Sequence, residues 1–284
     1  MAINLAEKYS KKIADAFYKE SVILGKTSKE YDWDGVNSIK VYTINTVAPT
    51  DYLRPTDDSA EGVSLARYGV THEVTDTIQT LTLTQDKGVS LSVDKGNNTQ
   101  QMLIKNAGVV MARELREQFV PMMDKYAIDK WATGAGQYTI DSELTKSNIV
   151  EAIFAHVTKI RNKYATIDDA FTYIKETDFA KLLLSPEFLN VDKLGERNLE
   201  KGVLGKVRGI QIVPVPDDYF AEGINFLTVK KSAVLAPTKI KDAKVHQDPP
   251  GISGALLEVR WLYDAFVLNT KKNGIVVSLT EQPS

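Results

Sequence analysis

An apolar stripe runs through the middle third of the chain. Large apolar residues recur every three or four positions between residues 104 and 131, with Met111 and Leu115 among them, which is the spacing of one helical face. The pattern predicts a single long helix over residues 99–131, with Met111 and Leu115 in a core. Pro121 lies inside the stripe. Because proline removes a helical hydrogen bond without shifting the stripe, we expect the helix to bend there and to continue.

The chain before this helix has the pattern of an arm followed by a long β excursion. Apolar residues at helical spacing over residues 5–22 predict a short amphipathic helix. The polar stretch over residues 26–37 is predicted to be an extended arm. Residues 38–44 alternate as a strand, and residues 46–94 alternate Thr, Val and Leu between prolines and glycines. Their first half has little apolar content, so the excursion lacks a core of its own and should lean on another copy.

The chain after the long helix changes to alternating helix and strand signals. We expect helices over residues 148–164 and 177–184 and strands over residues 170–174 and 209–215, the habit of a compact α/β unit. A polar, glycine-punctuated stretch over residues 190–206 is expected to be a mobile loop.

The C-terminal part is predicted to be mostly strand. Short strands over residues 226–229 and 233–235 precede a turn at 248–251. A long strand at 256–268 then leads through Asn273-Gly274 into a strand at 275–279, and Asn-Gly favours a tight hairpin. We expect this hairpin to pack on the long helix with Trp261 in the core.

Composition removes several classes of function. The 284 residues are 43% hydrophobic and 25% charged, with no cysteine, so disulfides, thiolate zinc sites and cysteine nucleophiles are excluded. The formal net charge of −2 argues against a dedicated nucleic-acid binder. Residues 1–29 and 230–244 are rich in lysine and residues 51–76 in acids. This segregation is either solvated surface or a set of complementary patches that meet between copies. We find neither a membrane-spanning run nor an export signal.

No catalytic, metal-binding or cofactor-binding residue is assigned. The histidines His72, His156 and His246 lie far apart without metal-ligand spacing. We interpret His156, inside a predicted helix, as a packed or surface side chain. Adjacent aspartates occur beside turn residues, where aspartate normally caps or is solvated. No Gly-x-Ser-x-Gly motif is present.

The order of parts, together with two stretches of sequence, resembles a known family. The first stretch is RWLYDAFVLN at residues 260–269, followed by KKNGI at 271–275. It is similar to the closing hairpin of capsid proteins from phages of low-GC Gram-positive hosts. The second is GIQIVPVPD at residues 209–217, which is similar to the strand that leaves the axial domain of those proteins. The chain thus resembles the major capsid proteins of tailed bacteriophages, which have the α+β Hong Kong 97 fold. The resemblance implies an N-terminal arm (1–37), an extended loop (46–93), a peripheral domain (38–45, 94–133 and 236–284, with the spine helix at 99–131) and an axial domain (134–235).

The resemblance also implies a function based on assembly. Pentamers and hexamers would build an icosahedral head shell, assembled in the host cytoplasm together with a portal and enclosing double-stranded DNA through non-specific contacts. The implied neighbour-overlapping residues of the extended loop are Tyr52, Arg54, Asp57, Asp58 and Arg67, and residues 190–206 would lie near the centre of each ring. Some family members link a loop lysine to an asparagine of a neighbour, but residues 54–67 contain no lysine, so this chemistry is not carried over.

Assembly control and two rival functions complete the expectations. The chain reaches its predicted arm helix directly after Met1, which leaves no room for a fused scaffolding segment. We therefore expect a separate scaffolding protein, with Lys8, Lys11 and Lys12 on an arm that faces scaffold or genome. The first rival is an encapsulin-like nanocompartment shell with protein cargo. The second is a cytosolic α/β enzyme built on residues 148–220.

Overall fold

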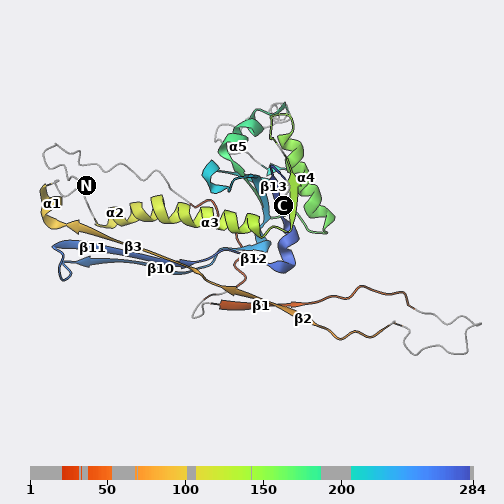
Figure 1. Ribbon diagram of the computed structural model, residues 1–284, viewed down its shortest axis with the longest axis horizontal. Coiled ribbons are helices and arrows are strands. Elements are labelled where there is room, and N and C mark those ends of the chain that lie inside the picture. Colours follow the sequence, from red (N-terminus) through yellow and green to blue (C-terminus); the bar gives the residue numbers. More distant parts are fainter. Residues whose placement is uncertain are drawn as a thin grey trace, which may run out of the picture. The chain divides into compact units, whose positions relative to one another are not determined.

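The computed structural model of the protein describes residues 21–31, 33, 38–52, 68, 70–100, 107–141, 143–186 and 206–281 (Figure 1). The chain divides into two compact units, a small one over Ser38–Leu81 and a large one formed by Met1–Asn37 and Thr82–Ser284. The predicted helix over residues 5–22 and the predicted loop over residues 190–206 fall almost entirely outside the described residues.

A long antiparallel sheet forms one part of the large unit. Its strand order is β10 (Thr238–Gln247), β11 (Gly254–Tyr263) and β3 (Gln85–Asp94). All ten residues of β11 are in register with β3, from Gly254 opposite Asp94 to Tyr263 opposite Gln85. Side chains alternate along β11, with Leu257, Val259 and Trp261 buried. One face of the sheet is therefore apolar and the other polar, as expected for an antiparallel sheet covered on one side.

The long helix predicted from the apolar stripe covers this apolar face (Figure 1). It runs without a break through α2 (Ala107–Glu114), a π-helical turn η2 (Leu115–Phe119) and α3 (Val120–Thr133). A separate short helix, α1 (Lys95–Gln100), precedes it, and residues 101–106 lie outside the described residues. Met111 and Leu115 pack with Phe119 and Trp261 in one cluster. The predicted helix is thus confirmed from Ala107 onward, as is its contact with Trp261.

The π-helical turn is the local adaptation to Pro121. Proline has no N–H to donate and its ring crowds the preceding turn. Just before it, the Val120 N–H bonds to the Leu115 carbonyl, five residues back. Such wider turns occur mostly as single-turn insertions in α-helices. As predicted, the helix continues through the proline, and the π turn lies directly N-terminal to it. The bend at Pro121 stays a prediction.

A six-stranded mixed sheet forms the other part of the large unit. Its strand order is β4 (Gln137–Ile140), β13 (Ile275–Leu279), β8 (Ile224–Lys230), β5 (Ala170–Lys175), β7 (Ile210–Val215) and β6 (Lys206–Val207). α4 (Ile149–Asn162) and α5 (Glu176–Leu183) cover one face, and α3 packs on the other. The predicted helices and strands of this α/β part are confirmed to within two residues.

Short elements connect the two sheets. β9 (Val234–Leu235) pairs with β12 (Phe266–Val267), and three 3-10 helices, η4 (Asp217–Tyr219), η5 (Lys231–Ala233) and η6 (Asn269–Gly274), lie between strands. The N-terminal segment over residues 21–33 reaches the same region, where Trp33 stacks on Phe266 with ring centroids 5.5 Å apart.

The small unit is a two-stranded hairpin of β1 (Ser38–Ile44) and β2 (Asp76–Thr82). Just beyond the strands, Asn45 links the segment after β1 to the segment before β2. Its backbone N–H donates to the Thr75 carbonyl at 2.9 Å, and its side chain forms hydrogen bonds of 3.0 Å with the side chains of Thr75 and Thr77. The strand over residues 38–44 thus groups with residues 45–81 in the small unit.

The predicted hairpin between residues 256–268 and 275–279 is wrong. β11 is paired on both edges, with β10 and β3, so no edge remains for β13. β13 instead pairs with β4 and β8 in the six-stranded sheet. Asn273-Gly274 ends the 3-10 helix η6 and forms no tight hairpin turn. Residues 236–284 therefore contribute β10 and β11 to the three-stranded sheet and β13 to the six-stranded sheet.

Candidate interaction surfaces

The small unit presents apolar side chains to solvent. Of its described residues, only Val41 and Leu81 are buried large hydrophobics. Eight exposed ones, which we call the β1–β2 apolar surface, are Tyr42, Ile44, Val47, Tyr52, Tyr68, Val70, Val74 and Ile78. Half of the exposed large hydrophobics among the described residues come from this one segment. An apolar surface of this density is typical of a segment that binds another chain.

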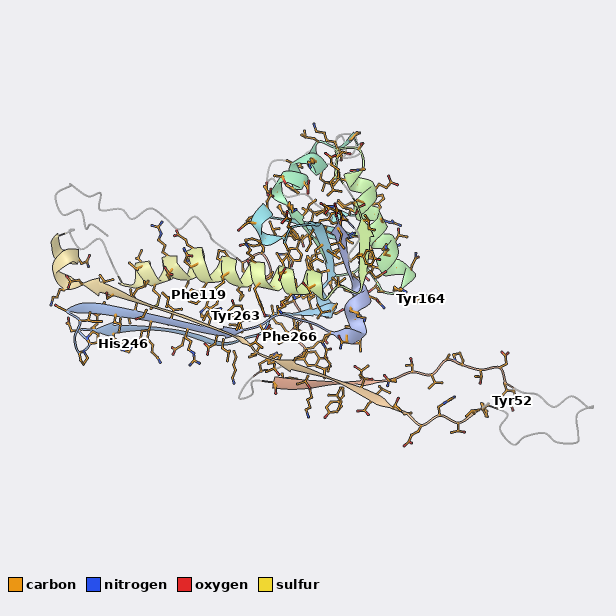
Figure 2. The ribbon with its side chains drawn as sticks, viewed as in Figure 1. Tyr52, Phe119, Tyr164, His246, Tyr263 and Phe266 are labelled. Atoms are coloured by element: carbon orange, nitrogen blue, oxygen red, sulfur yellow. The ribbon has the colours of Figure 1, made fainter. Side chains whose placement is uncertain are left out.

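Only one of the predicted loop residues lies in the described part of the chain. Tyr52 is 45% exposed and packs edge-on against Tyr68, with ring centroids 5.0 Å apart (Figure 2). The other predicted loop residues, Arg54, Asp57, Asp58 and Arg67, and the predicted arm residues, Lys8, Lys11 and Lys12, lie outside the described residues. Their predicted roles remain predictions.

The outer face of the three-stranded sheet is polar and carries its own ion pairs. Arg260 donates two hydrogen bonds to Asp86, of 2.9 and 2.6 Å. The hydrogen bond from Arg260 lowers the pKa of Asp86. Lys244 lies 2.8 Å from Asp242. Because the two signs are interspersed, this face does not attract partners of one charge over a long range.

Asp264 joins three elements at the end of β11. It is 4% exposed, and its Oδ2 accepts hydrogen bonds from the backbone and hydroxyl of Thr84, both at 2.8 Å. Its Oδ1 accepts from the Tyr126 hydroxyl at 2.9 Å and the Ala265 N–H at 2.8 Å. Burial, aided by Asp264, raises the pKa of Tyr126 to about 12. The start of β3 is thereby fixed to α3.

Asp124 holds the N-terminal segment against α3 in a similar way. It is fully buried and accepts hydrogen bonds from the Ser21 hydroxyl (2.5 Å) and the Val22 N–H (2.8 Å). Burial raises the pKa of Asp124 to about 6, although these hydrogen bonds and the charge of Lys26 oppose the rise. Lys26 itself bonds to the Val22 carbonyl at 2.8 Å. The segment entering the large unit is therefore fixed through a carboxyl group that titrates near neutrality.

A buried chain of polar groups crosses the six-stranded sheet around His156. Thr139 donates to Asp141 at 2.8 Å, so its oxygen accepts from His156 Nε2 at 2.9 Å. His156 Nδ1 must then accept from the Thr228 hydroxyl, also at 2.9 Å. The assignment gives a neutral imidazole protonated at Nε2. Burial accordingly lowers the pKa of His156 to about 3.

This network is structural, because its members bond to one another and all except the half-buried Asp141 are closed to solvent. Thr172 completes one end through Thr228 at 2.9 Å, and Ser278 the other through Asp141 at 2.7 Å. His156, Thr172, Thr228 and Ser278 are fully buried. The interpretation of His156 as a packed side chain is confirmed. A buried and fully bonded network cannot present a nucleophile to a substrate.

The titrations of Asp124 and His156 make opposite contributions to stability in acid. On unfolding, the imidazole returns to a pKa of about 6.5, so the unfolded chain binds a proton that the folded chain does not. The free energy of unfolding therefore falls by about 1.4 kcal/mol per pH unit below pH 6.5 from this group. Asp124 acts in reverse, since between pH 6 and 4 the folded chain holds the proton. The contribution of Asp124 to the free energy of unfolding therefore rises as the pH falls.

We expect Asp124→Asn to remove the compensating contribution. Between pH 6.5 and 4, the free energy of unfolding of the variant should fall relative to the unchanged protein by about 3 kcal/mol in total. Urea unfolding at several pH values measures this difference, and the other carboxyl groups cancel because both proteins share them. His156→Gln is the matched second variant, with the opposite change in slope. Parallel pH profiles for Asp124→Asn and the unchanged protein would contradict the role of Asp124.

Sequence analysis missed both buried aspartates, although each left a signal. Asp124 lies four residues after Val120 and four before Ile128, inside the apolar stripe of the helix. Asp264 interrupts an apolar stretch between Tyr263 and Ala265. A charged residue in an apolar stripe is normally hydrogen-bonded when buried. Within the described ranges, no group of His, Asp or Glu side chains could hold a metal ion, and no helix is long and apolar enough to cross a membrane.

Comparison with known proteins identifies the fold. No protein-family model and no curated protein matches the chain. Solved structures do match over nearly its whole length. A chain of Mycobacterium phage Che8 is 16% identical over 96% of both chains, with a TM-score of 0.74. The capsid of Cyanophage P-SCSP1u is 14% identical over 96% of this chain and 92% of that one, with a TM-score of 0.73, and the mature capsid of bacteriophage PhiM1 is 16% identical over 98% of this chain and 92% of that one, with a TM-score of 0.69. The chain has the fold of phage capsid subunits, and the expected α+β Hong Kong 97 fold is confirmed.

A weaker likeness bears on one rival function. A virus-like particle from Pyrococcus furiosus is 13% identical, with a TM-score of 0.50 over 85% of this chain and 86% of that one. The phage structures above are more similar both in TM-score and in coverage.

Proposed function

We propose that the protein is the major capsid protein of a tailed phage, which self-assembles into an icosahedral head shell and encloses double-stranded DNA. The observation that carries the proposal is the small unit: a hairpin with an exposed apolar surface and almost no core, within a chain of capsid fold. Such a segment gains most by packing on another copy. Each contact is weak, and the closed lattice is stable because every subunit makes several.

The remaining parts of the proposal concern organisation and partners. The arm (1–37), extended loop (46–93), peripheral domain and axial domain (134–235) are the proposed divisions, with pentamers and hexamers as the proposed rings. A scaffolding protein and a portal are proposed partners, and DNA contact is proposed to be non-specific and electrostatic. The proposed location is the virion, after assembly in the host cytoplasm, and no catalytic role is proposed.

Deleting residues 51–68 should leave a folded, soluble protein that no longer forms closed shells. The deletion removes the tip of the excursion and leaves β1, β2 and the large unit in place. Electron microscopy and sedimentation of the expressed protein, with its scaffolding protein where one is identified, measure the assemblies, and circular dichroism checks the fold. Normal shells from the deletion variant would contradict the assembly role of the excursion.

Point substitutions on β1 and just before β2 test whether assembly depends on the apolar side chains of the excursion or on its length alone. Tyr42→Thr with Val74→Thr keeps residues that suit strands and removes two exposed apolar side chains. We expect it to weaken assembly in the same direction as the deletion. Lys40→Thr, an exposed position two residues from Tyr42 on the same side of β1, is the matched control and should assemble normally.

The nanocompartment shell remains the second candidate, supported by the likeness to the Pyrococcus furiosus particle. The two functions differ in what the shell contains. Shells isolated from the native source should protect double-stranded DNA from nuclease if the phage function is right. Shells that hold a protein cargo and no DNA would favour the nanocompartment.

A further inference from the structure

Tyr164 follows the end of α4 in a backbone conformation that favours glycine. The helix closes with hydrogen bonds from the Tyr164 N–H to the Arg161 carbonyl (2.9 Å) and from the Ala165 N–H to the Ile160 carbonyl (3.3 Å). This pair of bonds defines a Schellman motif, whose left-handed position is usually glycine. Tyr164 occupies that position with φ of 58°. A side chain here destabilises the isolated subunit relative to glycine.

The Tyr164 ring is fully exposed, at 100% (Figure 2). It lies at the end of α4, and the outward side of this helix carries other groups that suit a protein interface. Phe154, on the outward side of α4, is 40% exposed, and the Arg208 guanidinium lies 5.3 Å from the centre of its ring. Arg208 also has a left-handed backbone, with φ of 49°. Tyrosine and arginine are enriched among the residues that contribute most to binding between proteins.

Basic side chains lie along the outward side of α4. Arg161 and Lys163 are exposed next to Tyr164 and Arg208 beside Phe154, whereas Asp168 and Asp169 are exposed in the turn that follows. We call Phe154, Arg161, Lys163, Tyr164 and Arg208 the α4 outer surface. Arg161 and Lys163 belong to the end of the helix, where cations are favoured by the helix dipole. The charge is thus compatible with the subunit's own stability and is available to a partner of opposite sign.

An exposed acidic surface lies on the opposite side of the same sheet. α4 covers one face of the six-stranded sheet, whereas η4 packs with α3 on the other through Tyr219. Figure 1 shows α3 and α4 on different sides of β13. The exposed acids around η4 are Asp217, Asp218 and Glu222, which we call the η4 acidic surface, and Lys125 of α3 lies 3.8 Å from Asp218. Asp217 also accepts a hydrogen bond from the Thr177 N–H at 3.2 Å, which joins η4 to the start of α5.

We propose that the α4 outer surface of one copy binds the η4 acidic surface of a second copy. The two surfaces differ and lie on opposite faces of one sheet, so the contact is head-to-tail and can repeat around a ring. Opposite charges orient the two copies, and the Tyr164 ring supplies the apolar area at the centre. The proposal rests on the proposed shell function, and it identifies residues through which copies join within a ring.

Tyr164→Gly tests the proposal because its two expected effects have opposite signs. Glycine relieves the left-handed backbone, so the melting temperature of the unassembled subunit should rise by about 2 °C. Loss of the ring should raise the subunit concentration required for assembly about tenfold. Asp248→Asn is the control, since it eases a left-handed residue (φ 45°) in the β10–β11 turn and can keep the side-chain hydrogen bond to Gly254. It should leave assembly unchanged.

Charge reversal tests the identity of the partner surface. Arg161→Glu with Lys163→Glu should block assembly, as should Asp218→Lys with Glu222→Lys, and the four changes together should restore it. Failure of restoration, or normal assembly by Tyr164→Gly, would overturn the proposed contact while the unchanged protein still assembles. Absence of rings, tubes and shells from the unchanged protein would contradict the shell function itself, so the two failures are distinguishable.

Discussion

Replacing Trp261 by alanine should lower the free energy of unfolding by about 3–5 kcal/mol. Trp261 is 7% exposed and lies in the cluster between β11 and the long helix, with its ring 5.3 Å from that of Phe119. Alanine would leave a cavity that the paired strands on either side of β11 cannot close. Chemical denaturation of the unassembled subunit, followed by circular dichroism, measures the loss.

Arg260→Ala is the matched control for this substitution. Arg260 precedes Trp261 in the same strand and points to the opposite, exposed face, where it pairs with Asp86. Exposed ion pairs contribute little, so the expected loss is small beside that of Trp261→Ala. A loss of less than about 1 kcal/mol for Trp261→Ala would mean that the cluster does not hold the helix to the sheet.

Asp264→Ala is expected to cost about 3 kcal/mol or more, although it removes few atoms. The change leaves the Thr84 N–H, the Tyr126 hydroxyl and the Ala265 N–H without their acceptor in a buried place. Each unsatisfied buried group costs about 1–3 kcal/mol. Because Thr84 immediately precedes β3, we also expect faster hydrogen exchange at the start of that strand.

Two further variants make the Asp264 result specific. Tyr126→Phe removes one of the donors and should cost about 1 kcal/mol. Asp86→Ala removes an exposed aspartate of β3 and should lower the free energy of unfolding far less than Asp264→Ala does. Equal losses for Asp264→Ala and Asp86→Ala would show that the buried hydrogen bonds at Asp264 are dispensable.

Local periodicity predicted the elements, and it failed where the partner of a strand had to be chosen. The long helix and the α/β part could be recognised because their apolar positions repeat at short range. The pairing of β13 could not, since its neighbours β4 and β8 lie more than 40 residues earlier in the chain. Asn273-Gly274 favoured a hairpin locally, but β11 already had partners on both edges.

The functional residues were less predictable than the fold. The excursion without a core was visible in its composition, and its exposed apolar side chains agree with that expectation. Tyr164 gave no signal, because only the fold shows that its backbone is left-handed and its ring exposed. The link from Asp124 to Ser21 joins positions 103 residues apart. Such a distance leaves no trace in local spacing.

The π turn over Leu115–Phe119 also bears on how this helix can change in length during evolution. A turn closed between residues five apart holds one residue more than an α-helical turn, so it stores the equivalent of a single-residue insertion. Deleting one residue in this turn, with Pro121 replaced by another residue, would yield a regular α-helix. The parts before and after the turn would keep their orientation relative to each other. A loss in α3 before Asp124 would instead rotate Asp124 and Tyr126 by about 100° relative to the preceding helix, and hence away from their partners. Length variation among homologous helices should therefore be concentrated at this turn.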